Sequence, residues 1–134
     1  MNKPILCLDF DGVIHWYRKG WQDGSIYDSV TPGFFAWAEK ASQHFQLFIY
    51  SSRSSTADGI AAMRHWLLIE HAKWKEIVSS QGAVDIEFNF ISIKPPAFIT
   101  IDDRAFQFKG RWDDENLIPE KLKLFKPWNA HALG

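Results

Sequence analysis

Short apolar runs alternate with segments of helical periodicity along this chain. The run PILCLDF at residues 4–10 is apolar up to its acidic end, which is typical of a strand buried on both faces. Thr31-Pro32 predicts a helix start, with a capping hydroxyl followed by proline in the first turn. That helix keeps one apolar face to about residue 44, formed by Phe34, Trp37, Ala38, Ala41 and Phe45. A second strand is predicted over residues 46–50.

The same alternation continues in the second half. A helix is predicted from about Thr56, with an apolar stripe formed by Ile60, Met63, Leu67, Trp74 and Val78. Residues 97–101 predict a further strand, Phe106 and Phe108 an edge strand, and residues 119–126 a short helix. Strands alternating with helices predict one α/β domain with a mostly parallel sheet, in which the first strand is central.

Two segments fit this pattern less well. Residues 86–93 are rich in β-forming side chains, but parallel neighbours need a connection of about a dozen residues, and the gap from Ile93 to Phe98 is shorter. That segment is either a short edge element or an extended stretch. Residues 13–30 lack periodicity and contain two glycines, so they predict a loop or flap.

Composition narrows the class of protein. The 134 residues suffice for one domain spanning 1–134, and 46% hydrophobic against 23% charged residues is the balance of a globular protein. A net charge of -1 gives no general attraction to nucleic acid, so such a partner would need a local patch. The single Cys7 allows no internal disulfide and is expected to be buried. Without a long apolar run or signal-peptide core, we expect no membrane partner and a cytoplasmic location.

Reactive side chains follow three of the predicted strands. Asp9 and Asp11 close the first strand, Ser51 follows the second, and Asp102 and Asp103 follow a later one. Ligands of open α/β sheets bind at the carboxyl ends of the strands, so these groups are expected to converge. Converging carboxylates repel one another unless a cation lies among them, and oxygen ligands suit Mg²⁺ better than zinc.

Four segments, in order, carry a resemblance to a known family: LDFDGV (8–13), FIYSSR (48–53), Lys94 and TIDDRA (100–105). The set resembles the haloacid dehalogenase superfamily of phosphohydrolases. The resemblance implies a three-layer Rossmann-like domain and a Mg²⁺-dependent phosphatase that forms an aspartyl-phosphate. The intervals between the segments leave no room for a separate cap domain, so we expect an open site beside a flap at about residues 13–30.

The resemblance also implies a role for each matched residue. Asp9 would be the nucleophile, and Asp11 the acid and base, which requires a pKa well above the ~3.9 of free aspartate. The backbone carbonyl of Asp11 would also bind Mg²⁺. An aspartate at position 11 favours phosphate chemistry, because family members without it include the dehalogenases and ion-pumping ATPases.

The remaining matched residues surround the transferred group. Ser51 would hydrogen-bond a phosphoryl oxygen, and Lys94 would offset the charge of Asp9 and the phosphoryl group. Asp102 would bind Mg²⁺ directly, with Asp103 helping through a water molecule. Alternatively, Ser51 is a helix cap and Lys94 an ordinary surface lysine, eight residues before Asp102 and therefore of doubtful reach.

Candidates for substrate contact are Ser52, Arg53, His15 and Trp16. Arg53 could equally pair with an acid. Residues 15–21 interleave aromatic and basic side chains, which can stack on bases and meet phosphates, but such a loop can also fold onto itself through its aromatics. The composition of this loop weakly favours a nucleotide or a nucleic-acid end as the substrate.

Two alternatives stay open at this point. The chain could be a catalytically idle binding module, although it retains both Asp9 and Asp11. It could also be a phosphatase for a small metabolite, with a second subunit acting as the lid. The oligomeric state is not indicated by the sequence.

Overall fold

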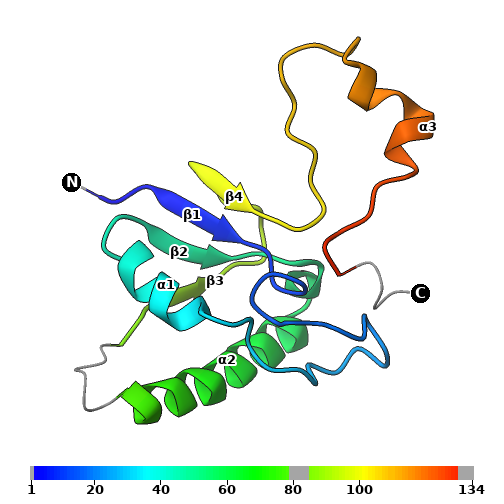
Figure 1. Cartoon of the computed structure of the whole chain (residues 1–134). Helices are drawn as coiled ribbons and strands as arrows, with labels where there is room; N and C mark the ends of the chain where they lie inside the picture. Colours follow the sequence, from blue (N-terminus) through cyan, green and yellow to red (C-terminus); the bar gives the residue numbers. More distant parts are fainter. Residues whose placement is uncertain (1, 79–84, 130–134) are drawn as a thin grey trace.

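The computed structural model describes residues 2–78 and 85–129 (Figure 1). Its four strands are β1 (Ile5–Leu8), β2 (Gln46–Ile49), β3 (Phe88–Phe90) and β4 (Ile99–Ile101). They form one all-parallel sheet in the order β3-β2-β1-β4. The predicted α/β class and the central position of the first strand are therefore confirmed.

Two helices cover one face of this sheet. They are α1 (Phe34–Ala41) and α2 (Ala57–Val78), drawn on the same side in Figure 1. Phe35 of α1 stacks on His71 of α2 with ring centroids 5.0 Å apart. The core beneath them contains Leu6, Leu8, Leu47, Ile49, Met63 and Leu67. No helix in the described part of the chain is long and apolar enough to cross a membrane.

The connection from β3 to β4 settles the ambiguity at residues 86–93. These strands lie at opposite edges, so the length rule for neighbouring strands does not apply. Strands lie about 4.8 Å apart, so the crossing is roughly 14 Å wide, and an extended chain over residues 91–98 reaches further than that. Cys7 is buried, as expected, and burial raises the pKa of its thiol; a hydrogen bond with Thr100 and, to a smaller extent, the charge of Lys94 in the crossing act in the opposite direction.

The described residues show two layers rather than the expected three. A parallel sheet of this order carries its third layer on the face opposite α1 and α2, where the right-handed crossover to β4 runs. Here that crossover is the extended segment 91–98, and no helix lies within it among the described residues.

The start of α1 differs from the prediction. The helix begins at Phe34, and its N-cap is Gly33 with φ 81°, a left-handed conformation that suits glycine. The Thr31 hydroxyl donates to the Val13 carbonyl at 2.8 Å instead of capping the helix. Trp37, predicted on the buried face, is 39% exposed. The flap therefore holds Thr31 in place before the helix starts.

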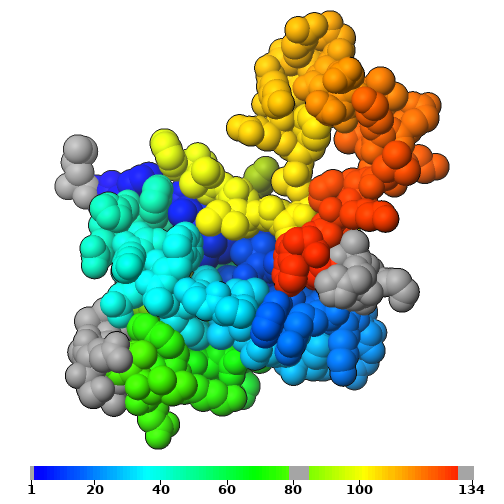
Figure 2. Space-filling view, viewed as in Figure 1, coloured from blue at the N-terminus to red at the C-terminus, as the bar shows by residue number. Residues whose placement is uncertain are grey.

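The chain leaves the sheet after β4. Phe106 and Phe108 lie in no strand, so the predicted edge strand is wrong; β4 ends at Ile101 and the following segment extends away from the sheet (Figures 1 and 2). The short helix predicted over residues 119–126 begins as expected, with proline in its first turn, but α3 (Pro119–Leu122) ends four residues earlier. The chain then returns, and the Trp128 indole donates to the Gly12 carbonyl at 2.8 Å.

Candidate active site

Three carboxylates meet at the carboxyl ends of β1 and β4. Asp9 directly follows β1, and its N–H donates to the Ile101 carbonyl at 3.0 Å. Asp102 and Asp103 directly follow β4. One carboxylate oxygen from each of Asp9, Asp102 and Asp103 lies within 4.8 Å of the others. The convergence expected from the sequence is therefore present for these residues.

Negative charge in this cluster exceeds what the surrounding protein neutralises. Burial raises the pKa of Asp9 to about 7, against a hydrogen bond from the Phe10 backbone, and the carboxylates of Asp102 and Asp103 raise it further. Burial likewise raises the pKa of Asp103. Among the described residues, Asp103 Oδ1 is buried and has no hydrogen-bond partner. An oxygen-only donor set with surplus negative charge fits a hard divalent cation such as Mg²⁺.

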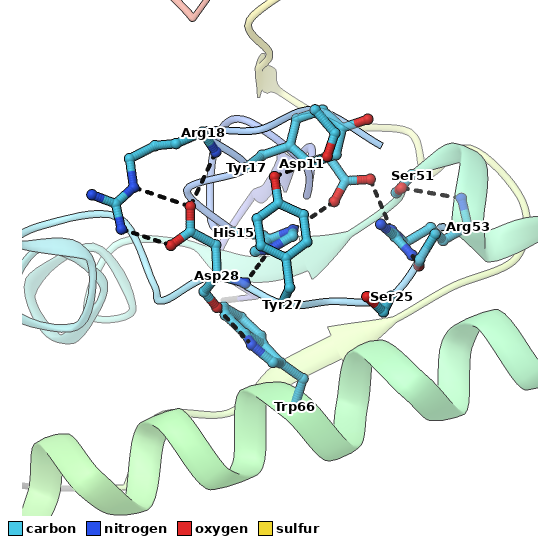
Figure 3. Close-up of polar contacts among 12 residues, drawn as sticks. Asp11, His15, Tyr17, Arg18, Ser25, Tyr27, Asp28, Ser51, Arg53 and Trp66 are labelled. Atoms are coloured by element: carbon cyan, nitrogen blue, oxygen red, sulfur yellow. Dashed lines mark hydrogen bonds and ion pairs between the residues drawn. The ribbon is translucent and has the colours of Figure 1, made fainter. Parts of the chain in front are cut away.

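Asp11 has a different environment, shown in Figure 3. Its two carboxylate oxygens lie 2.8 Å from His15 Nδ1 and 2.8 Å from Arg53 Nε. The N–H of Asp28 donates to His15 Nε2 at 3.0 Å, so that nitrogen is unprotonated and Nδ1 carries the hydrogen that Asp11 accepts. Both sides of the Asp11 carboxylate are therefore held by donors.

The pKa of Asp11 contradicts the expectation from the sequence. Burial alone would raise it, but the hydrogen bonds from His15 and Arg53 outweigh burial and lower it below the usual value. The expected pKa well above that of free aspartate is wrong for this structure. The reason is that Arg53 pairs with Asp11, which was the alternative role considered for this arginine.

Ser51 both caps a turn and borders the site. Its Oγ accepts the N–H of Arg53 at 3.1 Å, and its own N–H donates to Ser54 Oγ at 3.0 Å, which starts a 3₁₀ turn at Ser52–Ser55. The hydroxyl hydrogen of Ser51 takes no part in these bonds, so it can still be donated to a ligand. The capping and the phosphate-binding interpretations of Ser51 are therefore compatible.

A cleft of about 290 Å³ connects these groups. It is lined by Asp9, Asp11, Tyr17, Trp21, Ser51, Ser52, Asp103 and Arg104. Arg104 was given no role from the sequence, although it directly follows the Asp102-Asp103 pair. Its guanidinium group forms no hydrogen bond or ion pair with any described residue. Its position directly after the strand-end residue Asp103 is the sequence signal that could have identified Arg104.

Five predicted site residues are not among those that line the cleft: Asp102, Arg53, Lys94, His15 and Trp16. Asp102 belongs to the carboxylate cluster, and Arg53 pairs with Asp11. Lys94 is exposed and lies in the crossing near Cys7. His15 is 0% exposed and contacts Asp11 from beneath. Trp16 lies under the Arg18 guanidinium, 3.9 Å from its ring centroid. His15 thus contacts two of the residues that line the cleft, Asp11 and Tyr17, with 5.6 Å between the His15 and Tyr17 ring centroids.

The flap is folded largely onto itself. Arg18 forms two side-chain bonds to the Asp28 carboxylate, at 3.1 and 2.9 Å. The Tyr27 hydroxyl accepts the N–H of Lys19 at 2.7 Å and donates to the Gly20 carbonyl at 2.8 Å. The charge of Arg18 is therefore used inside the flap, which leaves Tyr17 and Trp21 as the flap side chains at the cleft.

Comparison of the chain with protein-family models, curated proteins and solved structures finds no match. The site is thus described by its own geometry. It is a carboxylate-rich cleft at the carboxyl edge of a parallel sheet, with the Ser51 and Ser52 hydroxyl groups just after β2 and a guanidinium group at its margin.

Proposed function

We propose that this protein is a Mg²⁺-dependent phosphomonoesterase of the haloacid dehalogenase type. The observation that carries the proposal is the convergence of Asp9, Asp102 and Asp103 beside a cleft that also presents Asp11 and Ser51. The sequence resemblance supplies the same residues in the same order.

Asp9, Asp102, Asp103 and the Asp11 carbonyl would hold the cation. Asp103 is favoured over Asp102 as the stronger ligand, which reverses the order expected from the sequence. Asp103 shares a hydrogen bond with Asp9 and has an unpartnered buried oxygen, whereas Asp102 is exposed and accepts the N–H of Arg104 at 2.8 Å. When bound, Mg²⁺ supplies positive charge that offsets these carboxylates and the phosphoryl oxygens.

The reaction has two halves. An Asp9 oxygen attacks phosphorus, the ester P–O bond breaks, and the leaving oxygen takes a proton from solvent at the open cleft, because Asp11 is held as a carboxylate by His15 and Arg53. Asp11 then takes a proton from water as the water oxygen attacks phosphorus; the aspartyl–phosphate bond breaks and inorganic phosphate leaves. His15 and Arg53 favour the carboxylate form of Asp11, so they support its role as base in the second half.

The openness of the cleft indicates the size of substrate that can reach Asp9. The described residues contain no separate cap over it, so a large phosphorylated ligand can reach Asp9, and its own surface can exclude water. We therefore favour a nucleotide or a nucleic-acid end over a small sugar phosphate.

Phosphate release tests this function. The panel contains an aryl phosphate, mononucleotides, phosphorylated oligonucleotides, phosphopeptides and sugar phosphates, each with Mg²⁺ and with EDTA. We expect EDTA to abolish turnover and Asp9→Asn to lower kcat by roughly a thousandfold or more. The control is Asp113→Asn, because Asp113 is exposed, pairs with Arg111 and does not line the cleft.

Two outcomes would contradict the proposal. Full activity of Asp9→Asn would exclude Asp9 as the nucleophile. Absence of turnover on the whole panel, with Mg²⁺ shown to bind, would favour a binding module that does no chemistry.

A further inference from the structure

Trp21 is the flap tryptophan that borders the cleft, and its indole contacts Arg53 and Gly24. The Arg53 guanidinium carbon lies 4.5 Å from the ring centroid. The backbone of Gly24 packs against the ring, since a Cβ there would lie 2.9 Å from Trp21 Cζ2. Even so, the Trp21 side chain is 51% exposed. Trp21 is therefore in contact with Arg53 and Gly24 and still open to solvent over about half of its surface.

The support is shared with the reacting groups. The Arg53 side chain, 7% exposed, donates from Nε to Asp11 at 2.8 Å and from Nη1 to the Gly24 carbonyl at 2.6 Å. One guanidinium group thus links the Asp11 carboxylate, the Gly24 turn and the Trp21 ring. The indole is consequently fixed in position relative to the cleft before any ligand arrives, which lowers the entropic cost of binding.

We propose that Trp21 is a stacking surface for a nucleobase, so that the substrate is a phosphorylated nucleotide, either free or at the end of an oligonucleotide. This inference rests on the proposed function. A preformed aromatic ring beside a phosphate site recognises a planar group carried near the phosphate, and base–aromatic stacking is sequence-tolerant. The exposed Arg104 at the same cleft matches the charge of the phosphate.

A matched pair of substrates isolates the base. AMP and ribose 5-phosphate carry the same phosphate ester on the same sugar and differ in the base alone. With Mg²⁺, we expect kcat/KM to be about tenfold or more higher for AMP. Trp21→Ala should bring the ratio of the two kcat/KM values close to one, and Trp21→Phe should retain most of it.

A matched pair of glycine variants tests the support of the ring. Gly24→Ala places a methyl group against Trp21, whereas Gly33→Ala meets no atom within 4 Å, and both positions have positive φ (86° and 81°). Backbone strain is therefore similar in the two variants. We expect Gly24→Ala to lower the AMP to ribose 5-phosphate ratio as Trp21→Ala does, and Gly33→Ala to keep it. The ratio is insensitive to loss of folded protein, because both substrates meet the same sample.

The outcomes separate this inference from the proposed function. Equal turnover of the two substrates by the wild-type protein would overturn the role of Trp21 and leave the phosphatase intact. If neither is hydrolysed, calorimetric titration of the wild type with the same two ligands decides: tighter binding of AMP, lost in Trp21→Ala, supports the stacking surface, and equal or no binding overturns it. The inference would also be overturned if a phosphopeptide were hydrolysed faster than both AMP and a phosphorylated oligonucleotide. The ratio for AMP against the oligonucleotide tells which source of nucleotide is preferred.

Discussion

Asp9 and Asp11 are two residues apart, yet the protein treats their charges in opposite ways. Asp11 accepts hydrogen bonds from His15 and Arg53, and its pKa is lowered. Asp9 is buried beside two other carboxylates, and its pKa is raised to about 7. Among the described residues, Asp11 is therefore paired with an arginine and a histidine, whereas Asp9 lies beside two further carboxylates, as the proposed cation site requires.

The difference arises from the turn after β1. Asp9 faces the end of β4, and Asp11 faces the flap and the end of β2. Gly12, with φ 84°, allows the chain to turn there, and a Cβ at this position would overlap the Asp103 carboxylate. Two aspartates on one strand end are thereby directed to two different environments.

Removal of the Arg53 charge should have the largest effect on this contrast. Arg53→Met leaves the buried Asp11 carboxylate with His15 alone, so we expect the free energy of unfolding to fall by about 3 kcal/mol. Denaturant unfolding measures it. Arg111→Met is the control, because both side chains of its pair with Asp113 are exposed (66% and 72%), and such pairs contribute little to the free energy of unfolding. Equal losses in the two variants would show that Arg53 holds no special place.

The pH dependence of the metal-free protein sharpens the same contrast. With a folded pKa of about 7 against the usual 3.8, Asp9 keeps its proton in the folded state where the unfolded chain has lost it. Stability should therefore fall as the pH rises from 5 toward 7, by roughly 1–3 kcal/mol. Asp11 and Asp28, whose pKa values are lowered, stay ionised over this range and add no slope.

Thermal unfolding in EDTA between pH 5 and 8 checks this expectation. Asp9→Asn should flatten the profile relative to the wild type, and Mg²⁺ should raise Tm at pH 7 and above through binding to the folded state. A wild-type profile parallel to that of Asp9→Asn, with no shift on addition of Mg²⁺, would contradict a cation site at this cluster.

The smallest of these effects concerns which basic side chain contacts the phosphate of the substrate. Arg104 lines the cleft and Lys94 does not, so Arg104→Ala should raise KM about tenfold and Lys94→Ala should leave it nearly unchanged. Steady-state kinetics on the best substrate of the panel gives both values. The reverse order would restore the role that the family resemblance implies for Lys94.

Much of the fold follows from local pattern. The apolar run before Asp9 predicted β1, and the stripe containing Met63 and Leu67 predicted α2, because burial on both faces or on one side leaves a clear mark in sequence. The convergence of Asp9 with Asp102 and Asp103 followed from the rule that parallel strands end at one edge.

Other features depend on contacts that are distant in the chain. The pairing of Arg53 with Asp11 joins residues 42 positions apart, and no local spacing indicates it. The parallel pairing of β3 with β2 could not be predicted, because the connection from β3 to β4 is too short only if these two strands are neighbours, and the sequence does not give the strand order. Phe106 and Phe108 alternate as in a strand, yet β4 is already at the edge of the described sheet and the chain moves away from it.

The hydrogen bond from Trp128 to the Gly12 carbonyl has a consequence for synthesis. The two residues are 116 positions apart, so the turn that carries Asp11 leaves the ribosome long before its partner is made. The sheet and the flap can form while residues 102–127 are still being translated, but the Gly12 carbonyl has no indole partner until Trp128 emerges. A nascent chain halted between residues 102 and 127 would therefore have a folded sheet and a turn at Gly12 without its contact to Trp128.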